Sequence, residues 1–517
     1  MATVDEAATD VPDAYERLIE RSEKLTNVRM ASMVLGWDQR VMMPEGGTPA
    51  RAGQLSTLSS MAHELLVDDD VGAWLETLET GGVGGPETAS SHELTDEQAA
   101  VVRELRHEYS RAVDVPAELV ERLTAHQTQT QQTWQEAKAA DDFSQFAPAL
   151  EELIDLHRER AAAIDPAENP YRVLYEDSQP YLPLETVERI FDELRDHLVP
   201  LIAEIQEHGR DLPTPFSGHT YDEETQMELS EAALDVLGYD RAHGRLDTAP
   251  HPFMSGNQFD ARITTRFRED DPLDALTATI HEFGHATYQL GLRKDQYGTP
   301  LGASRSSGVH ESQSRFWENH VGRTKAFWEL FLPTVKTHFP HLEDVTVEEA
   351  YAAANRIYPD NRIRVEADEL TYHLHIILRC EIDRAFVEGD LEVSEIPQVW
   401  NDKMESYLGV RPETDTDGCL QDTHWSYGFA GFQGYTVGSV LAAQLDAAMR
   451  EDLDADVDDL IREGEFDPLR EWMTENVHRH GQRYPTEELI EVATGEPLTA
   501  KYFLEYVDEK FTDLYSL

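Results

Sequence analysis

Cysteine and basic residues are both scarce in this chain of 517 residues. Its two cysteines, Cys380 and Cys419, are too few for the disulfide framework of a small secreted protein. Lysine and arginine together number 43, against 101 aspartates and glutamates, and the net charge is −58. Because a surface of this sign repels phosphate groups, the composition argues against nucleic acids and anionic membranes as partners.

Long hydrophobic runs and a targeting signal are also lacking. No apolar run approaches the roughly 18 residues that a membrane-spanning helix needs. The N-terminus, MATVDEAATD, is acidic and lacks the basic-then-apolar pattern of a secretory signal. We therefore expect a soluble protein of the cytoplasm.

The excess of acidic residues also indicates the salt concentration at which the protein works. At ionic strength near 1 M the Debye length falls to about 3 Å, so repulsion between surface carboxylates is screened. A net charge of −58 therefore predicts a protein from a salt-rich cytoplasm, with an acidic mesophilic protein as the alternative.

Alternating strand patterns are scarce, and helical spacing dominates. Residues 183–208, for example, place apolar side chains three and four positions apart. Short strands are predicted at 251–253 and at 259–267, where the residues alternate and several are β-branched. A glycine- and serine-rich loop is predicted at 80–92 and a turn region at 291–308. With 517 residues, the chain is predicted to form a mainly α, two-lobed or multi-lobed fold.

One predicted helix carries the sequence TIHEFGH at 279–285. Asp271 can cap this helix, Pro272 suits its first turn, and Gly291 can end it. His281 and His285 then lie one turn apart on one face, where two neutral imidazoles can share a zinc ion at about 2 Å each.

The two residues between these histidines that matter most are Glu282 and Gly284. Glu282 can reach a metal-bound water without being a ligand itself. An ordinary surface helix is the alternative reading, but it leaves Gly284 unexplained, since glycine in a helix costs about 1 kcal/mol relative to alanine. A close neighbour on that face is a better reason for the glycine.

A catalytic zinc ion usually has a third protein ligand, and Glu311 is the candidate. After the turn region, Ser306 or Ser307 can cap a second helix that Gly322 can end. If this helix runs antiparallel to the first, Glu311 returns to the side of the two histidines. The alternative for Glu311 is a solvated carboxylate on a helix surface.

Six motifs in order resemble those of the Taq-type carboxypeptidases, the M32 metallopeptidases. They are HPF at 251–253, DARIT at 260–264, HEFGH at 281–285, HESQ at 310–313, IRVEAD at 363–368 and GCLQDTHW at 418–425. Residues 35–64 are also similar to the opening region of that family, so the resemblance spans nearly the whole chain.

The resemblance implies a large two-lobed helical fold, like neurolysin and angiotensin-converting enzyme, with a deep central cleft and a small β element. It implies one catalytic domain over 1–517, with 12–75 covering the cleft and the site motifs within 251–430. It further implies Zn²⁺ held by His281, His285 and Glu311, with Glu282 as general base. Broad side-chain tolerance, poor cleavage at proline, substitution of zinc by Co²⁺, and a homodimer are expected on the same basis. Together with the acidity, it indicates a halophilic archaeon.

Two further roles in the site have candidate residues: stabilising an oxyanion and orienting a ligand histidine. His424 and Tyr427 lie in a polar, aromatic stretch that suits a loop beside a cleft, and could stabilise an oxyanion; a packed histidine and a buried tyrosine are the alternatives. Asp368 is a candidate for orienting a ligand histidine, or else an acid on a helix surface.

A carboxypeptidase must bind a free terminal carboxylate, for which arginine offers a planar, bidentate fork. Arg364 is the first candidate and Arg411 the second; either could instead be an internal ion-pair partner. The resemblance implies that Arg262 and His251 contact the substrate or the walls of the cleft.

Two other patterns are predicted to serve packing rather than binding. His373 and His375 lie two residues apart on a predicted helix, so they point to different faces and suit the core or the surface rather than a metal. The regular glycines of 428–438 have no lysine beside them, which favours close backbone packing over phosphate binding.

Three functions remain in competition. The first is a zinc carboxypeptidase acting on peptides with a free C-terminal carboxylate, and the second is a zinc endo-oligopeptidase on the same scaffold. The third is a helical scaffold that has lost its metal, which the presence of HEFGH and Glu311 disfavours. Amidated peptides separate the first two, and metal analysis tests the third.

Overall fold

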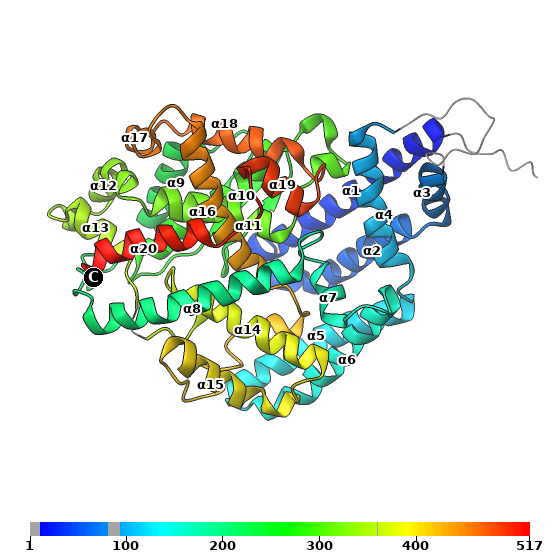
Figure 1. The fold of residues 1–517 in the computed structure, drawn as a ribbon, viewed down its shortest axis with the longest axis horizontal. Helices are drawn as coiled ribbons and strands as arrows, with labels where there is room; N and C mark the ends of the chain where they lie inside the picture. Colours follow the sequence, from blue (N-terminus) through cyan, green and yellow to red (C-terminus); the bar gives the residue numbers. More distant parts are fainter. Residues whose placement is uncertain (1–10, 81–93, 359) are drawn as a thin grey trace, which may run out of the picture.

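The computed structural model describes residues 11–80, 94–358 and 360–517. Over these residues the chain consists of helices and one small sheet, which confirms the predicted mainly α class (Figure 1). The loop predicted at 80–92 lies outside the described residues, except for Thr80 at the end of a helix. Among the helices that the described part of the chain contains, none is long and apolar enough to cross a membrane.

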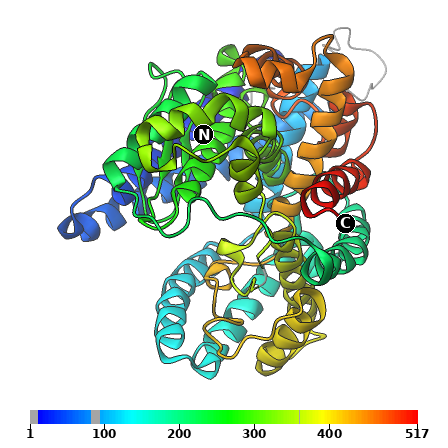
Figure 2. The same cartoon turned by 90° about the vertical axis from the view of Figure 1, so that its left-hand side faces the viewer.

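The N-terminal helices form a region with a core of its own. They are α1 (Val11–Val41), α2 (Thr48–Leu66), α3 (Asp69–Thr80) and α4 (Asp96–Val113). Leu18, Leu75 and Val101 bury their side chains in this smaller core. Beyond it, the end of α1 and the adjoining α2 project from the body as a hairpin, shown in blue in Figure 2.

The next helices carry the predicted periodicity into the main core. They are α5 (Ala117–Ala140), α6 (Ala147–Ile164), α7 (Pro170–Tyr175), α8 (Leu184–His208) and α9 (Glu223–Leu237). In α8 the apolar residues at the expected spacing, such as Val187, Ile190, Leu194 and Leu198, are fully buried. The helix predicted at 183–208 is therefore confirmed.

The small sheet has the strand order β1-β3-β2, from β1 (Leu246–Thr248), β2 (Met254–Gly256) and β3 (Ala261–Thr265). The predicted strand at 259–267 is confirmed as the central strand β3. The strand predicted at 251–253 is displaced, because β2 starts at Met254, where it pairs antiparallel with Ile263. Pro252 has no N–H for a strand ladder. Strand β1, which pairs parallel with β3, has no counterpart among the predicted strands.

Two consecutive helices pack antiparallel beside this sheet, as predicted. They are α10 (Pro272–Gly291) and α11 (Ser307–Arg315), which continues into the π-helix η5 (Phe316–Gly322). Ile280 of α10 faces Gly322, whereas Tyr288, two turns later, faces His310 at the other end of the pair. The turn region between the helices contains only short 3₁₀ segments.

The remaining helices complete the two lobes. They are α12 (Lys325–His338), α13 (Val347–Ala354), α14 (Thr371–Glu388), α15 (Ile396–Leu408), α16 (Gln433–Asp452), α17 (Val457–Glu463), α18 (Asp467–Asn476), α19 (Thr486–Thr494) and α20 (Lys501–Tyr515). In both ribbon views α5, α6 and α15 lie apart from the body that holds α10, α11 and α16 (Figures 1 and 2).

Helix α16 crosses α11 at Gly434 and Gly438, and for these two glycines the prediction of close packing is confirmed. A Cβ atom at Gly431 would meet nothing within 4 Å, so close packing does not explain that glycine. A Cβ atom at Gly438 would lie 2.5 Å from the Cβ of Glu311, closer than real atoms approach. The contact sets Glu311 firmly between α16 and α10.

Candidate metal centre

Local sequence signals set the ends of α10. The Asp271 side chain accepts a hydrogen bond from the Leu273 N–H at 3.0 Å, and Pro272 occupies the first turn. A carboxylate at this end also interacts favourably with the positive pole of the helix. The predicted helix is confirmed from its cap to Gly291.

Gly284 lets the two helices touch backbone to backbone. A Cβ atom there would lie 2.5 Å from the Ser314 Cα and 2.6 Å from the Gln313 carbonyl oxygen. No other residue fits at this distance. The close neighbour predicted for Gly284 is therefore present, and it is the helix that carries Glu311.

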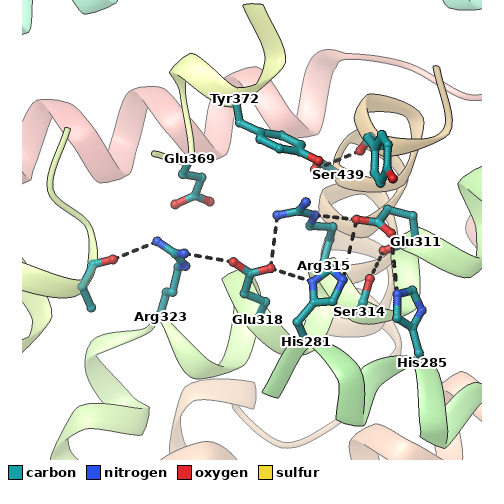
Figure 3. A network of polar contacts seen from close by, with 12 residues as sticks. His281, His285, Glu311, Ser314, Arg315, Glu318, Arg323, Glu369, Tyr372 and Ser439 are labelled. Carbon is teal, nitrogen blue, oxygen red and sulfur yellow. Dashed lines mark hydrogen bonds and ion pairs between the residues drawn. The ribbon is translucent and has the colours of Figure 1, made fainter. Parts of the chain in front are cut away.

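Three side chains converge where these helices meet (Figure 3). One donor atom from each of His281, His285 and Glu311 lies within 4.8 Å of the others. Glu311 Oε2 is 3.6 Å from His285 Nε2, and Glu311 Oε1 is 3.9 Å from His281 Nε2. Ligands about 2 Å from one tetrahedral ion lie about 3.4 Å apart, so the arrangement fits a single divalent metal.

Both histidines are oriented through the ring nitrogen that faces away from this point. Nδ1 of His285 lies 3.1 Å from the His310 carbonyl oxygen, and Nδ1 of His281 lies 2.8 Å from Glu318 Oε2. Each Nδ1–H therefore donates, which leaves the Nε2 lone pair free for a metal. Burial lowers the pKa of His285 well below its usual value, with His310 and His281 adding to the effect, so the ring stays neutral as a ligand must.

Glu318, which is not among the residues predicted for the site, contacts His281 and is held by two arginines. Burial alone would raise the pKa of Glu318, but Arg315 and Arg323 lower it well below its usual range, so the carboxylate remains charged. Arg315 donates to Oε2 at 3.1 Å and Arg323 to Oε1 at 2.9 Å. The spacing Glu311, Arg315, Glu318 places all three on one helical face, and this signal was available in the sequence.

Asp368 does not orient a ligand histidine, so that prediction is wrong. Its carboxyl oxygens accept hydrogen bonds from the backbone N–H groups of Tyr358 at 3.0 Å and Thr371 at 2.9 Å, and from the Asn361 side chain. Asp368 thus caps the start of α14 and ties down the segment before it.

Glu282 follows His281 on α10 and is only 6% exposed. A backbone hydrogen bond from Met254 in β2 holds its carboxyl group, while Oε2 has no hydrogen-bond partner among the described residues. Burial raises the pKa of Glu282 to about 7, and the neighbouring Glu311 contributes. A buried carboxyl oxygen without a partner is unfavourable unless water or another group satisfies it.

His281 and Glu282 face a cavity of about 760 Å³. Arg364 lines the same cavity and is 8% exposed. It donates to Asp422 at 2.5 Å through Nε and to the Tyr372 hydroxyl at 3.4 Å through NH1. Arg364, the first candidate for binding the terminal carboxylate, thus lies in the same cavity as Glu282 and the candidate metal ligand His281.

Arg411 lies elsewhere. Its exposed guanidinium pairs with Asp402 at 2.9 Å and Glu405 at 2.7 Å on the surface of α15. It is not among the described residues that line the cavity. An ion pair was the alternative weighed for Arg411, although this pair is at the surface rather than internal.

His424, Tyr427, His251 and Arg262 are likewise absent from the described lining of the cavity. His424 pairs with Asp422, which also holds Arg364, and the Tyr427 hydroxyl accepts a hydrogen bond from Gln131. Tyr427 is 46% exposed, so it is not the buried tyrosine of the alternative reading.

The DARIT motif supplies most of the central strand β3, and the HPF motif directly precedes β2. His251 is exposed, and its neighbour Pro252 lines the cavity. Arg262 pairs with Asp260 at 2.7 Å and stacks over Trp37 of α1, 4.4 Å from the ring centre.

His373 and His375 belong to the core, which confirms the structural reading. Both are at most 1% exposed. His373 Nδ1 lies 3.1 Å from the Thr436 hydroxyl, and His375 Nε2 lies 3.0 Å from the Asn361 carbonyl oxygen.

These contacts define a candidate metallopeptidase centre in a mainly α fold. It has two histidines one helical turn apart, an adjacent buried glutamate and a third donor from the next helix. Comparison with known proteins makes the class specific. The chain belongs to the Carboxypeptidase Taq (M32) metallopeptidase family, whose model matches residues 17–511.

Relatives match over nearly their whole length. Thermostable carboxypeptidase 1 of Thermus thermophilus is 36% identical over 513 residues, covering 97% of this chain and 99% of the relative. Carboxypeptidase 1 of Bacillus subtilis is 35% identical over 507 residues, covering 97% and 99%. The crystal structure of the M32 carboxypeptidase from Deinococcus radiodurans is 38% identical, with a TM-score of 0.91 and coverage of 98% and 100%.

These findings confirm the predicted family, and with it a metallocarboxypeptidase that acts on peptides. A divalent metal is implied by the family, and the group of His281, His285 and Glu311 is the candidate site for it.

Proposed function

We propose that the protein is a zinc carboxypeptidase of broad specificity, in which His281, His285 and Glu311 hold the ion. The observation that carries the proposal is the convergence of these three donors within 4.8 Å. Two imidazole nitrogens and one carboxylate oxygen are a donor set typical of catalytic zinc, and Co²⁺ can substitute for it. When bound, zinc lowers the pKa of a coordinated water towards about 7 and polarises the scissile carbonyl.

Glu282 is proposed as the general base. Its Oε2 is buried and unpartnered, and the residue lines the same cavity as His281. From there it can take a proton from the attacking water and pass it to the leaving amine. The backbone of Met254 favours the charged form of this carboxyl group, which is the form that accepts a proton.

Arg364 is proposed to bind the terminal carboxylate of the peptide. Asp422 holds its Nε, which fixes the guanidinium plane. The rings of Phe432 and Tyr435 lie 5.9 and 5.7 Å from its Cζ atom, so aromatic side chains lie near the group. A fixed, planar cation of this kind suits bidentate recognition of a carboxylate.

His424 and Tyr427 remain the proposed donors to the oxyanion, and His251 and Arg262 the proposed residues of the cleft wall. His424 shares Asp422 with Arg364, so the two proposed substrate contacts are tied to one carboxylate. The Tyr427 side chain is exposed, so a bound peptide can reach it, although its hydroxyl accepts a hydrogen bond from Gln131. Arg411 remains the second candidate for the terminal carboxylate, behind Arg364.

The remaining expectations concern the setting of the enzyme. We propose a single catalytic domain over 1–517, in which 12–75 cover the cleft and 251–430 carry the site motifs. A homodimer is proposed on the family resemblance. The net charge of −58 supports a salt-rich cytoplasm, such as that of a halophilic archaeon.

The test is a timed digest of one peptide with a free C-terminus and of the same peptide with an amidated one, followed by mass spectrometry. The wild type is expected to give a ladder of C-terminal losses on the free peptide only, and the Glu282→Gln variant none on either. Internal fragments from both peptides would instead indicate an endo-oligopeptidase. Equal ladders from wild type and variant would remove Glu282 from the mechanism.

A further inference from the structure

We propose that Arg315 is a positioning residue that determines which oxygen of Glu311 is presented to the metal. The inference rests on the proposed metal site. It also rests on the position of the Arg315 guanidinium, which lies between the third ligand, Glu311, and Glu318, the residue that holds His281. None of the sequence motifs assigns a role to this arginine.

The first contact is with the candidate ligand itself. Arg315 Nε donates to Glu311 Oε1 at 2.9 Å (Figure 3). The other oxygen, Oε2, has no bond to Arg315 and lies 3.6 Å from His285 Nε2, while Oε1 lies 3.9 Å from His281 Nε2. Because Oε1 already accepts a charge-assisted hydrogen bond, Glu311 is set to bind an ion through Oε2 alone. One-point ligation leaves more of the coordination sphere open for water and substrate.

The second contact is with the residue that orients His281. Arg315 NH1 donates at 3.1 Å to Glu318 Oε2, the same oxygen that accepts from His281 Nδ1 at 2.8 Å. One side chain therefore touches both the third ligand and the partner of the first ligand. Lysine has a single ammonium and no planar fork, so it cannot reproduce both contacts with the same geometry.

The surroundings hold the guanidinium in this place. The Arg315 side chain is 15% exposed, and its Cζ atom lies 4.7 Å from the ring centre of Tyr372. On the other side, Glu318 is also held by Arg323, so its position does not depend on Arg315 alone. Loss of Arg315 should therefore affect Glu311 more than His281.

Replacement of Arg315 by methionine or lysine should weaken metal binding, because Glu311 becomes free to turn or to bind through both oxygens. Residues that orient metal ligands typically change metal affinity by about 10- to 100-fold when mutated. The matched control is Arg450→Met. Arg450 also pairs with a carboxylate four residues earlier, Asp446, at 2.8 Å, and it touches none of the three ligands.

The experiment measures zinc affinity by chelator competition and the visible absorption spectrum of the Co²⁺-loaded protein. Both Arg315 variants are expected to bind zinc about 10- to 100-fold more weakly and to show an altered Co²⁺ spectrum, whereas Arg450→Met keeps the wild-type values. If Arg315→Met does not fold, Arg315→Lys decides the question.

Wild-type affinity and an unchanged Co²⁺ spectrum in the folded Arg315 variants would overturn the inference. So would a change in KM for peptides alone, which would make Arg315 a substrate contact. If the wild type itself bound no ion, the proposed function would fail first, and the two failures are thus distinguishable.

Discussion

Substitution of Gly284 by alanine should disturb the metal centre without touching any ligand. Gly284 lies in α10 between the two histidines, at the point where α10 meets α11. An alanine Cβ would lie 2.5 Å from the Ser314 Cα and 2.6 Å from the Gln313 carbonyl oxygen. Both obstacles are backbone atoms, so no side-chain rotation can relieve the clash.

The size of the effect follows from ordinary contact distances. Carbon atoms pack at about 3.5 Å or more, so α10 and α11 must separate locally by about 1 Å. Metal–ligand distances in proteins are held to about 0.2 Å, so this separation moves Glu311 well outside the tolerance of a shared ion. For stability, overpacking costs about 1–3 kcal/mol, against a helix-propensity gain of about 1 kcal/mol for alanine. A net loss of up to about 2 kcal/mol is expected.

The assay compares Gly284→Ala with Gly53→Ala, a glycine inside α2 that has no atom within 4 Å of its would-be Cβ. Urea unfolding of the metal-free proteins gives stability, and chelator competition gives zinc affinity. Gly53→Ala should be stabilised by up to about 1 kcal/mol, with unchanged zinc affinity. If Gly284→Ala matched the wild type in both measurements, the close helix contact would not be what sets the ligand geometry.

Three other predictions concern substrate binding, the pH dependence of stability and the effect of salt. Arg364→Met should raise KM for peptides with a free C-terminus at least about tenfold, the equivalent of about 1.4 kcal/mol, while the surface variant Arg411→Met should leave KM unchanged; the reverse pattern would exchange their roles. Burial raises the pKa of Asp383 from 3.8 to about 8. The folded state therefore retains a proton that the unfolded state has lost, so the free energy of unfolding falls as pH rises through this range. Asp383→Asn should remove that fall between pH 5 and pH 8, and an unchanged slope in denaturant titrations would contradict it. Because of the charge of −58, the thermal midpoint should rise between about 0.2 and about 2 M KCl, and full stability and activity in salt-free buffer would contradict a salt-rich setting.

The features of the fold and of the site that could be predicted are those set by residues close together in the sequence. Asp271, Pro272 and Gly291 mark the ends of α10 locally, and the spacing of His281 and His285 needs only the helical period. Gly284 pointed to a close neighbour because a glycine inside a helix needs a reason. Glu311 followed from the expectation that the next helix runs back antiparallel to the first.

The roles of individual arginines and acids could not be predicted, because they depend on contacts between residues far apart in the sequence. Arg364 and Arg411 are alike in sequence, yet one is confined in the cavity and the other is exposed beside Asp402 and Glu405. Asp368 and Glu318 are likewise both acids, one at the end of the IRVEAD motif and one shortly after HESQ. Only the packed structure shows that Asp368 caps α14 while Glu318 receives His281 and two arginines.

Anomalous X-ray diffraction from crystals of the zinc-loaded protein, at energies on both sides of the zinc absorption edge, tests the central claim most directly. One strong peak is predicted per chain, within coordination distance of His281 Nε2, His285 Nε2 and a Glu311 carboxylate oxygen, and absent from Glu311→Ala crystals grown in the same zinc concentration. A peak that lies away from these three side chains, or none in the wild type, would contradict the account.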